Sequence, residues 1–388
     1  MKFVDQLLER LHSRAPARRN NDASTRNVDI AKTIHDALGS AGLEQSSAQG
    51  GQITRVINDA LARAGLLGAD GASASTNPGR FDSITPKLDS AVDDRLDASA
   101  SPQGQFLSRT FTSPAGALAY KLYVPGSYSA DATAAVPLLV MLHGCTQSPD
   151  DFAAGTRMNA LSERHGFLVA YPSQSAKANA NKCWNWFRPQ DQARGGGEPA
   201  LLAGMTAQLG VDYRVDPARI YVAGLSAGAA MAVVLGRTYP DVFAAVGAHS
   251  GLPYQAARDM GSAFAAMRNG AAGAADTASR AASAIMPTIV FHGDRDQTVA
   301  AANGDAIVAE QTGKAGLAST QERGTSQGGR GFKRTVYADA SGRSLVEDWR
   351  IDSGGHAWMG GSATGSYTDP QGVDASVEIL RFFLQHVR

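Results

Sequence analysis

The sequence predicts an α/β fold with a mainly parallel central sheet flanked by helices, over residues 105–388. The runs "VPLLVMLHG", "RIYVAGLSAG" and "MPTIVFHGD" are continuously apolar and end in glycine or just beyond it. This pattern is typical of strands that are buried on both faces of a parallel sheet. Helical stretches, for example "EPALLAGMTAQLG" and "GAAMAVVLGRTYP", lie between such runs. Strands that alternate with helices favour this fold class.

The remaining strands follow from their periodicity. "FLSRTFTS" and "LAYKLYVP" alternate apolar and polar residues, as half-buried strands do. "GFLVAYP" and "FAAVGAHSG" have the continuous apolar character of the buried strands. The expected chain order is therefore two half-buried strands followed by buried strands that alternate with helices.

Length and charge exclude several classes of protein. The chain has 388 residues, which is enough to bury a large core. Lys plus Arg and Asp plus Glu each number 36, so the charge balance favours neither a nucleic-acid partner nor an anionic membrane surface. No run approaches the roughly 20 apolar residues of a spanning helix. We therefore expect a soluble protein.

Residues 1–67 predict a helical extension that carries one motif twice. "IAKTIHDALGSAGL" starts at Ile30 and "ITRVINDALARAGL" starts at Ile53, with apolar residues at helical spacing in both. Gly42 and Gly65 stand where helices favour a C-terminal glycine. We expect two short amphipathic helices that pack on the protein or pair between copies, so the chain is a monomer or a weak oligomer. The alternative is a targeting segment that binds polymer granules.

Residues 68–104 are rich in Ala, Ser, Asp and Gly and predict a linker. The N-terminal stretch "MKFVDQLLERLHSRAPARR" has no uninterrupted apolar region, because Asp5, Glu9 and Arg10 interrupt it. A secretory signal peptide needs such a region. The residues themselves therefore favour a cytoplasmic location.

Ser226 is the candidate nucleophile. It lies in the GxSxG motif of "YVAGLSAGAAM", directly after a predicted buried strand and before an apolar helix. This is the context of a nucleophile elbow, where the turn is so tight that side chains two positions either side of the serine would collide. The following helix also directs its N-terminal amides toward the serine.

A serine hydroxyl needs a base to take its proton, so the sequence should supply a histidine. Of the eight histidines, His356 in the glycine-rich "GGHAWMGG" is the best candidate, because it follows the last clear strand. His249 follows a strand that comes soon after the serine and fits the expected order less well. His143 and His292 each precede a glycine at a strand end, and we expect structural roles for them.

The acid should follow a strand between the serine and the histidine, and the loop in "IVFHGDRDQTV" satisfies this condition. Asp294 and Asp296 are both candidates, and either could instead cap the next helix. Position favours Asp296 by a small margin, because Val299 can anchor the loop just after it.

An oxyanion hole requires two backbone donors directed at the developing negative charge. The amide of Ala227, directly after the nucleophile, is one candidate. The other should come from the loop after an early strand, which here is "LHGCTQ", so the amide of Cys145 is expected to contribute. Nothing in this chemistry calls for a metal or an organic cofactor.

The motifs "LHGCTQ", "CWNWF", "GLSAGAAM", "FHGDRDQTV" and "GGHAWMGG", in this order, resemble the poly(3-hydroxybutyrate) depolymerase esterase family. That family is close to the feruloyl and acetylxylan esterases within the α/β-hydrolase fold. The resemblance covers residues 105–388 and implies a catalytic triad of Ser226, Asp296 and His356. It also implies a disulfide between Cys145 and Cys183, and secretion of the protein.

The resemblance implies a serine esterase that acts on a polyester of the poly(3-hydroxybutyrate) type and on short esters. The alternative is an esterase of feruloylated or acetylated polysaccharides, and a third hypothesis is a granule-binding protein. Exposed aromatic rings bind an apolar polymer surface with large contact area. The candidate substrate contacts are Trp184, Trp186, Phe187 and Trp358, although one or two of these rings could be buried instead.

Overall fold

A computed structural model describes residues 104–131, 133–271, 285–313 and 316–388. The predicted helical extension, and the predicted linker up to residue 103, lie outside these residues. Within the described ranges, every helix is too short or too polar to cross a lipid bilayer.

A ten-stranded sheet forms the centre of the described residues. Its strands are β1 (Gln105–Ser113), β2 (Gly116–Val124), β3 (Val136–Leu142), β4 (Leu168–Pro172), β5 (Val215–Leu225), β6 (Ala245–His249), β7 (Thr288–Gly293), β8 (Ala318–Thr325), β9 (Gly331–Ala338) and β10 (Ser344–Ile351). They lie in the order β1-β2-β4-β3-β5-β6-β7-β10-β9-β8. All pairs from β4 to β10 are parallel, and the pairs at the two ends are antiparallel. The predicted mainly parallel sheet is confirmed.

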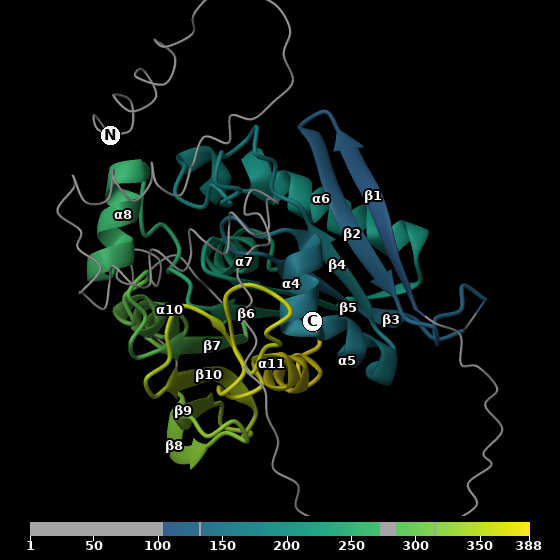
Figure 1. Ribbon diagram of the computed structural model, residues 1–388. Helices are drawn as coiled ribbons and strands as arrows, with labels where there is room; N and C mark the ends of the chain where they lie inside the picture. The colour runs from purple at the N-terminus through teal and green to yellow at the C-terminus, as the bar shows by residue number, and fades with distance from the viewer. Residues whose placement is uncertain (1–103, 132, 272–284, 314–315) are drawn as a thin grey trace, which may run out of the picture. The chain divides into compact units, whose positions relative to one another are not determined.

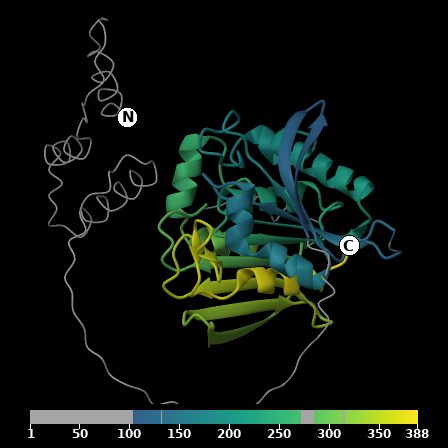
Figure 2. The ribbon, with the colours of Figure 1, turned by 45° about the vertical axis from the view of Figure 1, so that its right-hand side comes forward.

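Helices cover both faces of this sheet (Figures 1 and 2). They are α4 (Pro149–Thr156), α5 (Met158–His165), α6 (Gly197–Asp212), α7 (Ala227–Thr238), α8 (Met260–Asn269), α10 (Ala302–Thr312) and α11 (Ala375–Phe383), with a 3₁₀ turn η1 (Pro189–Gln192). A separate pair of two-residue strands, β11 (Trp358–Met359) and β12 (Thr368–Asp369), completes the structure. Helices α6, α7 and α10 contribute to one hydrophobic cluster, and α4, α5 and α11 to the other.

The strand β3 explains why two clusters form. Its residues alternate, so that Leu138 and Val140 belong to the cluster with α6 and α7, while Leu139 and Met141 belong to the cluster with α4 and α11. All four side chains are at most 1% exposed. A strand buried on both faces must be apolar at every position, which is why the run "VPLLVML" has no polar residue.

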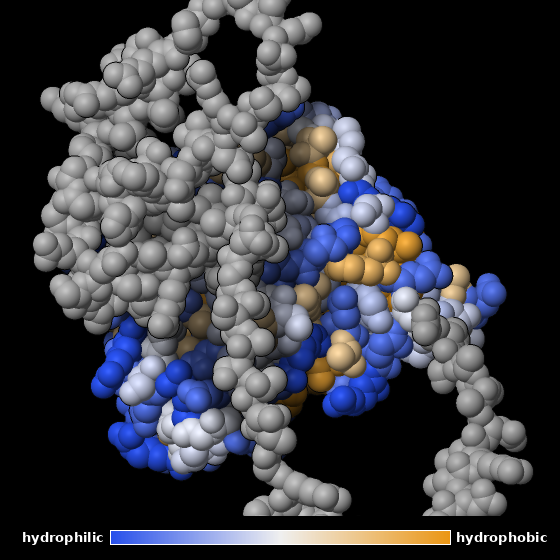
Figure 3. All heavy atoms as spheres, in the orientation of Figure 1, coloured by the Kyte–Doolittle hydropathy of each residue, from blue (hydrophilic) through white to orange (hydrophobic). Residues whose placement is uncertain are grey.

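The sheet brings its functional loops to one edge. Parallel strands end at the same edge of a sheet, where the loops after their carboxyl ends form ligand sites. The loops after β3, β5 and β7 begin directly after Leu142, Leu225 and Gly293. Where the described residues can be seen in Figure 3, their surface is mostly hydrophilic, with separate hydrophobic patches.

Candidate active site

Ser226 lies in a strained turn between β5 and α7. Its φ of 57° and ψ of −121° are rare for a residue other than glycine. The Ser226 amide donates a hydrogen bond of 2.9 Å to the carbonyl of His249, which helps to hold the turn. A Cβ on Gly224 would lie 2.5 Å from the carbonyl carbon of Gly228, and a Cβ on Gly228 would lie 2.1 Å from the carbonyl oxygen of Leu142. The glycines on either side of the serine are therefore required for the chain to make this turn.

His356 and Asp296 form a hydrogen-bonded pair. The Nδ1 atom of His356 donates to Oδ2 of Asp296 over 2.7 Å, because an ionised carboxylate can only accept. The other oxygen, Oδ1, accepts from the amides of Thr298 and Val299, at 2.9 Å each. The Asp296 side chain is completely buried, whereas Asp294 is exposed. The carboxylate that contacts the histidine is therefore Asp296.

Burial alone would raise the pKa of Asp296, but its hydrogen-bond donors outweigh that effect. The bond and positive field of His356, the amide of Val299 and the nearby His292 together lower this pKa to about 2. The Nε2 atom of His292 donates to the Val299 carbonyl over 2.8 Å and lies 3.5 Å from Oδ2 of Asp296. Burial lowers the pKa of His292 to about 4, so this histidine is neutral near pH 7. These contacts hold the acid ionised and in place.

His249 has a structural environment. Its ring stacks on Phe291 and Trp358 with centroids 5.7 and 5.2 Å away. Its Nε2 atom accepts a hydrogen bond of 3.0 Å from the amide of Met359. Burial lowers its pKa to about 3. These contacts agree with the expectation that His249 is a poorer candidate base than His356.

Ser226 and His356 line one cavity of about 450 Å³. Leu225, Leu252, Met260, Phe264, Trp186 and Phe187 supply much of its wall. Among the described residues, those that line the cavity include no Asp, Glu, Lys or Arg. The cavity therefore suits an uncharged, apolar group next to the serine.

The two residues predicted for the oxyanion hole, Cys145 and Ala227, line the same cavity. Ala227 is the first residue of α7, where amide groups have no acceptor within the helix. Cys145 lies in the loop after β3, and its neighbour Thr146 donates its amide to the carbonyl of Asn181 over 2.7 Å. The loop after β3 is thereby tied to the segment that carries the second cysteine.

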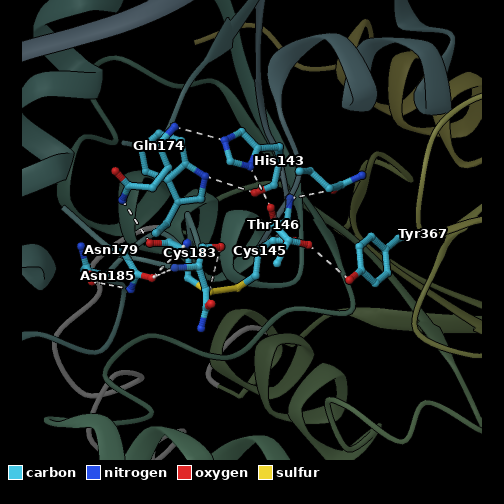
Figure 4. The surroundings of a disulfide bond; sticks show 12 residues. His143, Cys145, Thr146, Gln174, Asn179, Cys183, Asn185 and Tyr367 are labelled. Carbon is cyan, nitrogen blue, oxygen red and sulfur yellow. Dashed lines mark hydrogen bonds between the residues drawn. A yellow bond between two sulfur atoms is a disulfide. The ribbon is translucent and has the colours of Figure 1, made fainter. Parts of the chain in front are cut away.

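The predicted disulfide between Cys145 and Cys183 is confirmed, with their Cα atoms 4.3 Å apart (Figure 4). It joins the loop after β3 to the segment Cys183–Phe187, which we call the aromatic loop. Trp186 and Phe187 of this loop are 5% and 6% exposed and line the cavity. Their rings meet edge to face with centroids 5.6 Å apart. The bridge and the two rings thus form one wall beside Ser226.

Trp184 and Trp358 do not line the cavity, contrary to the expectation that they contact substrate. Trp184 is 0% exposed, and its Nε1 atom donates to the carbonyl of His143 over 3.1 Å. Trp358 is 1% exposed, and its Nε1 atom donates to Oγ of Ser376 over 3.0 Å. Because it lies two residues after His356, this buried ring anchors the histidine loop. Both tryptophans belong to the core.

Helix α8 contributes to the cavity wall, which was not predicted from the sequence. Met260, Phe264 and Met267 line the cavity from this helix, and Met260 and Phe264 are 52% and 54% exposed. Their spacing of three and four residues resembles the buried face of an ordinary amphipathic helix. The pattern alone gave no signal that these side chains surround a cavity.

Comparison with known proteins identifies the family. The family model described as "Esterase PHB depolymerase" matches residues 118–329, which is more than half of the chain. The chain belongs to this family. The match includes the loop after β3, the disulfide, Ser226 and Asp296, and the region after residue 329 that carries His356 lies beyond it.

Individual relatives show how far the similarity extends. The poly(3-hydroxyalkanoate) depolymerase C of Paucimonas lemoignei is 39% identical over 263 residues, which are 66% of this chain and 62% of that protein. The poly(3-hydroxybutyrate) depolymerase of Ralstonia pickettii is 26% identical over 70% of this chain and 58% of its own length. The chain thus spans about six-tenths of the length of these relatives.

A solved structure supports the fold. The acetyl xylan esterase from Aspergillus awamori superposes with a TM-score of 0.56 at 18% identity, covering 72% of this chain and 99% of that one. The described residues therefore have the α/β-hydrolase fold that the motifs implied.

Proposed function

We propose that the protein is a serine esterase that hydrolyses carboxylic esters through an acyl-enzyme on Ser226. The hydrogen bond between Asp296 and His356, with His356 lining the same cavity as the strained Ser226, is the observation that carries this proposal. A serine, a histidine and a carboxylate with these roles perform acyl transfer on several unrelated folds.

In the proposed mechanism, Nε2 of His356 takes the proton of Ser226 as its oxygen attacks the ester carbonyl. Asp296 keeps the other ring nitrogen protonated and stabilises the imidazolium that forms. The amides of Cys145 and Ala227 donate to the oxyanion of the tetrahedral intermediate. His356 then protonates the leaving alcohol, and water attacks the acyl-enzyme in the same way. The pKa of about 2 for Asp296 keeps this carboxylate ionised throughout.

Ser226→Ala tests the chemistry directly. We expect kcat on p-nitrophenyl butyrate to fall by about 10⁴-fold or more, because the substitution removes the hydroxyl that accepts the acyl chain. Circular dichroism of the variant checks that the fold is intact. A folded Ser226→Ala protein with more than a trace of activity would show that the nucleophile is assigned wrongly.

For the substrate, we propose a polyester of the poly(3-hydroxyalkanoate) type. The relatives that are similar over two-thirds of this chain are named as depolymerases of such polymers. The uncharged cavity wall and the exposed Met260 and Phe264 on α8 fit an aliphatic ester chain that continues beyond the scissile bond.

The alternative substrate is an ester of a plant polysaccharide. The feruloyl esterase B of Neurospora crassa is 33% identical over 33% of this chain, which favours this second candidate. Clearing of a poly(3-hydroxybutyrate) emulsion and release of ferulate from methyl ferulate separate the two. In the Phe264→Ser variant, emulsion clearing should fall by more than hydrolysis of p-nitrophenyl acetate. Release of ferulate without polymer clearing would favour the carbohydrate esterase.

The N-terminal extension supports a further, separate proposal. We propose that its two predicted helices pair between copies of the chain or associate with polymer granules. Removal of residues 1–100 should then lower the number of chains per particle seen in light scattering, or abolish granule binding, while hydrolysis of soluble esters continues. An unchanged number of chains per particle together with unchanged granule binding would rule out both roles.

A further inference from the structure

Glu198 is a half-buried carboxylate behind the aromatic loop that the proposed mechanism does not use. It lies in the first turn of α6, after the glycine-rich stretch "RGGG". A Cβ on Gly197 would lie 2.0 Å from Oδ1 of Asp191, and Gly197 has a φ of +50°. The same Asp191 oxygen accepts the Glu198 amide over 2.7 Å. The turn before α6 is therefore built to place Glu198 at one position.

Three N–H groups surround the Glu198 carboxylate. Oε2 accepts from the amide of Asn185 over 2.7 Å. Oε1 accepts from Nδ2 of Asn185 and from Nε2 of Gln174, at 2.5 Å each. Because both oxygens accept N–H groups, these hydrogen bonds favour the ionised form of the carboxylate.

The residues that supply these donors, Asn185 and Gln174, lie near the disulfide (Figure 4). Asn185 is in the aromatic loop, two residues after Cys183 and directly before Trp186. Gln174 follows β4, and its Nε2 atom also donates to the carbonyl of Cys183 over 3.1 Å. The Gln174 amide donates to Nε2 of His143, which lies two residues before Cys145. One carboxylate thus connects the aromatic loop with the loop that holds the predicted oxyanion amide.

We propose that Glu198 is a positioning residue that holds the aromatic loop, and with it Trp186 and Phe187, against the cavity next to Ser226. The disulfide holds Cys183, and hydrogen bonds hold the Trp184 ring and the Trp186 carbonyl. Glu198 holds Asn185, the residue between the two tryptophans, through both its backbone amide and its side chain. The proposal rests on the proposed esterase function, since it assigns Trp186 and Phe187 to the acyl wall.

The pKa of Glu198 supports this reading. Burial, together with the nearby Asp191, raises it to about 7 although the three donors act in the opposite direction. Burial of a carboxylate costs free energy unless hydrogen bonds compensate for the lost water, and here the hydrogen bonds from Asn185 and Gln174 do so.

Glu198→Gln has the same shape but carries an N–H₂ in place of one oxygen. If the N–H₂ group replaces Oε2, it faces the backbone N–H of Asn185, which is also a donor. If it replaces Oε1, it faces the N–H₂ groups of Asn185 and Gln174. Rotation of the Asn185 side-chain amide would remove that clash but would break the hydrogen bond that Asn185 Oδ1 accepts from Asn179. No orientation keeps all the hydrogen bonds. The matched control is Glu378→Gln, which loses an ion pair with Arg381 on α11, at the other face of the sheet.

The first measurement is the rate at which dithiothreitol reduces the disulfide, which depends on access to the sulfur atoms. Loss of a hydrogen bond to a charged group should raise this rate about tenfold in Glu198→Gln, with little change in Glu378→Gln. The second measurement is the ratio of KM for p-nitrophenyl octanoate to KM for p-nitrophenyl acetate. This ratio should rise about fivefold in Glu198→Gln, because binding of the long acyl chain depends on the ordered rings of Trp186 and Phe187.

A wild-type reduction rate in Glu198→Gln would overturn the proposal. So would a faster reduction with an unchanged KM ratio, or an equal loss of kcat on both esters without a change in KM. If Glu198→Gln does not fold, Asn185→Ala removes one of the same bonds from the loop side and should change both quantities in the same direction. The reduction assay involves no substrate, so its result stands apart from that of Ser226→Ala.

Discussion

Replacing Asp296 with asparagine should reverse the direction of one hydrogen bond. Oδ1 of Asp296 accepts two amides, from Thr298 and Val299. In Asp296→Asn the carbonyl oxygen must take this position, because an N–H₂ group there would face two donors. The N–H₂ group then points at Nδ1 of His356, 2.7 Å from the present Oδ2.

The imidazole must respond by changing its tautomer. Nδ1 of His356 becomes the acceptor, so the ring proton moves to Nε2. A protonated Nε2 cannot take the proton of Ser226. We expect kcat on p-nitrophenyl butyrate to fall by about 10⁴-fold, which corresponds to about 5 kcal/mol of activation free energy.

The same substitution has a second effect, on stability. The pKa of Asp296 is lowered from 3.8 to about 2 in the folded protein, a contribution of about 2 kcal/mol to the free energy of unfolding. A lowered carboxyl pKa stabilises the fold above pH 4, and this contribution disappears as the pH falls through 2. Asp296→Asn should therefore be less stable than the wild type at pH 7, and the difference should shrink toward pH 2.

Kinetics and urea unfolding of three proteins check these effects. The matched control is Asp294→Asn, which removes an exposed carboxylate two residues away and should keep activity close to that of the wild type. If Asp294→Asn were the inactive variant, or if Asp296→Asn kept more than a tenth of kcat, the role of Asp296 would be refuted.

Two further predictions follow from the elbow and the disulfide. Gly228→Ala should abolish activity and lower the unfolding free energy by about 1–3 kcal/mol, because the new Cβ would lie 2.1 Å from the carbonyl oxygen of Leu142. The control is Gly210→Ala inside α6, where a Cβ meets nothing within 4 Å. This substitution should raise the unfolding free energy by about 0.5–1 kcal/mol. Thermal unfolding compares the two, and equal stability would contradict the role of the turn. Cys183→Ser should lower the unfolding free energy by about 4 kcal/mol, because the bridge to Cys145 spans 38 residues. An unchanged urea midpoint would show that the aromatic loop is ordered without the disulfide.

Local chemistry made much of the site predictable. The continuous apolar run of β3 can only be satisfied by a sheet covered on both faces, and the glycines around Ser226 indicate a turn that admits no Cβ. Asp294 and Asp296 were hard to separate, because the difference arises from the loop backbone, whose amides at Thr298 and Val299 hold only one of the two carboxylates.

The positions of the tryptophan rings could not be derived in this way. Trp184 is fixed by the carbonyl of His143, and Trp358 by the hydroxyl of Ser376. The first partner lies in the loop after β3 and the second on α11, so the spacing of aromatic residues along one loop contains no information about them. The same is true of α8, where Ala263 and Ala266 are buried while Met260 and Phe264 are exposed.

The small residues on the inner side of α8 have a consequence for how this protein could change over evolution. Ala263 and Ala266 are the buried residues of α8, whereas Ser226 continues a strand in the middle of the sheet. Replacement of Met260 or Phe264 alters the wall of the cavity without removing a large core side chain. Laboratory selection for new esters should therefore accumulate substitutions in α8 well before it reaches β5 or α7.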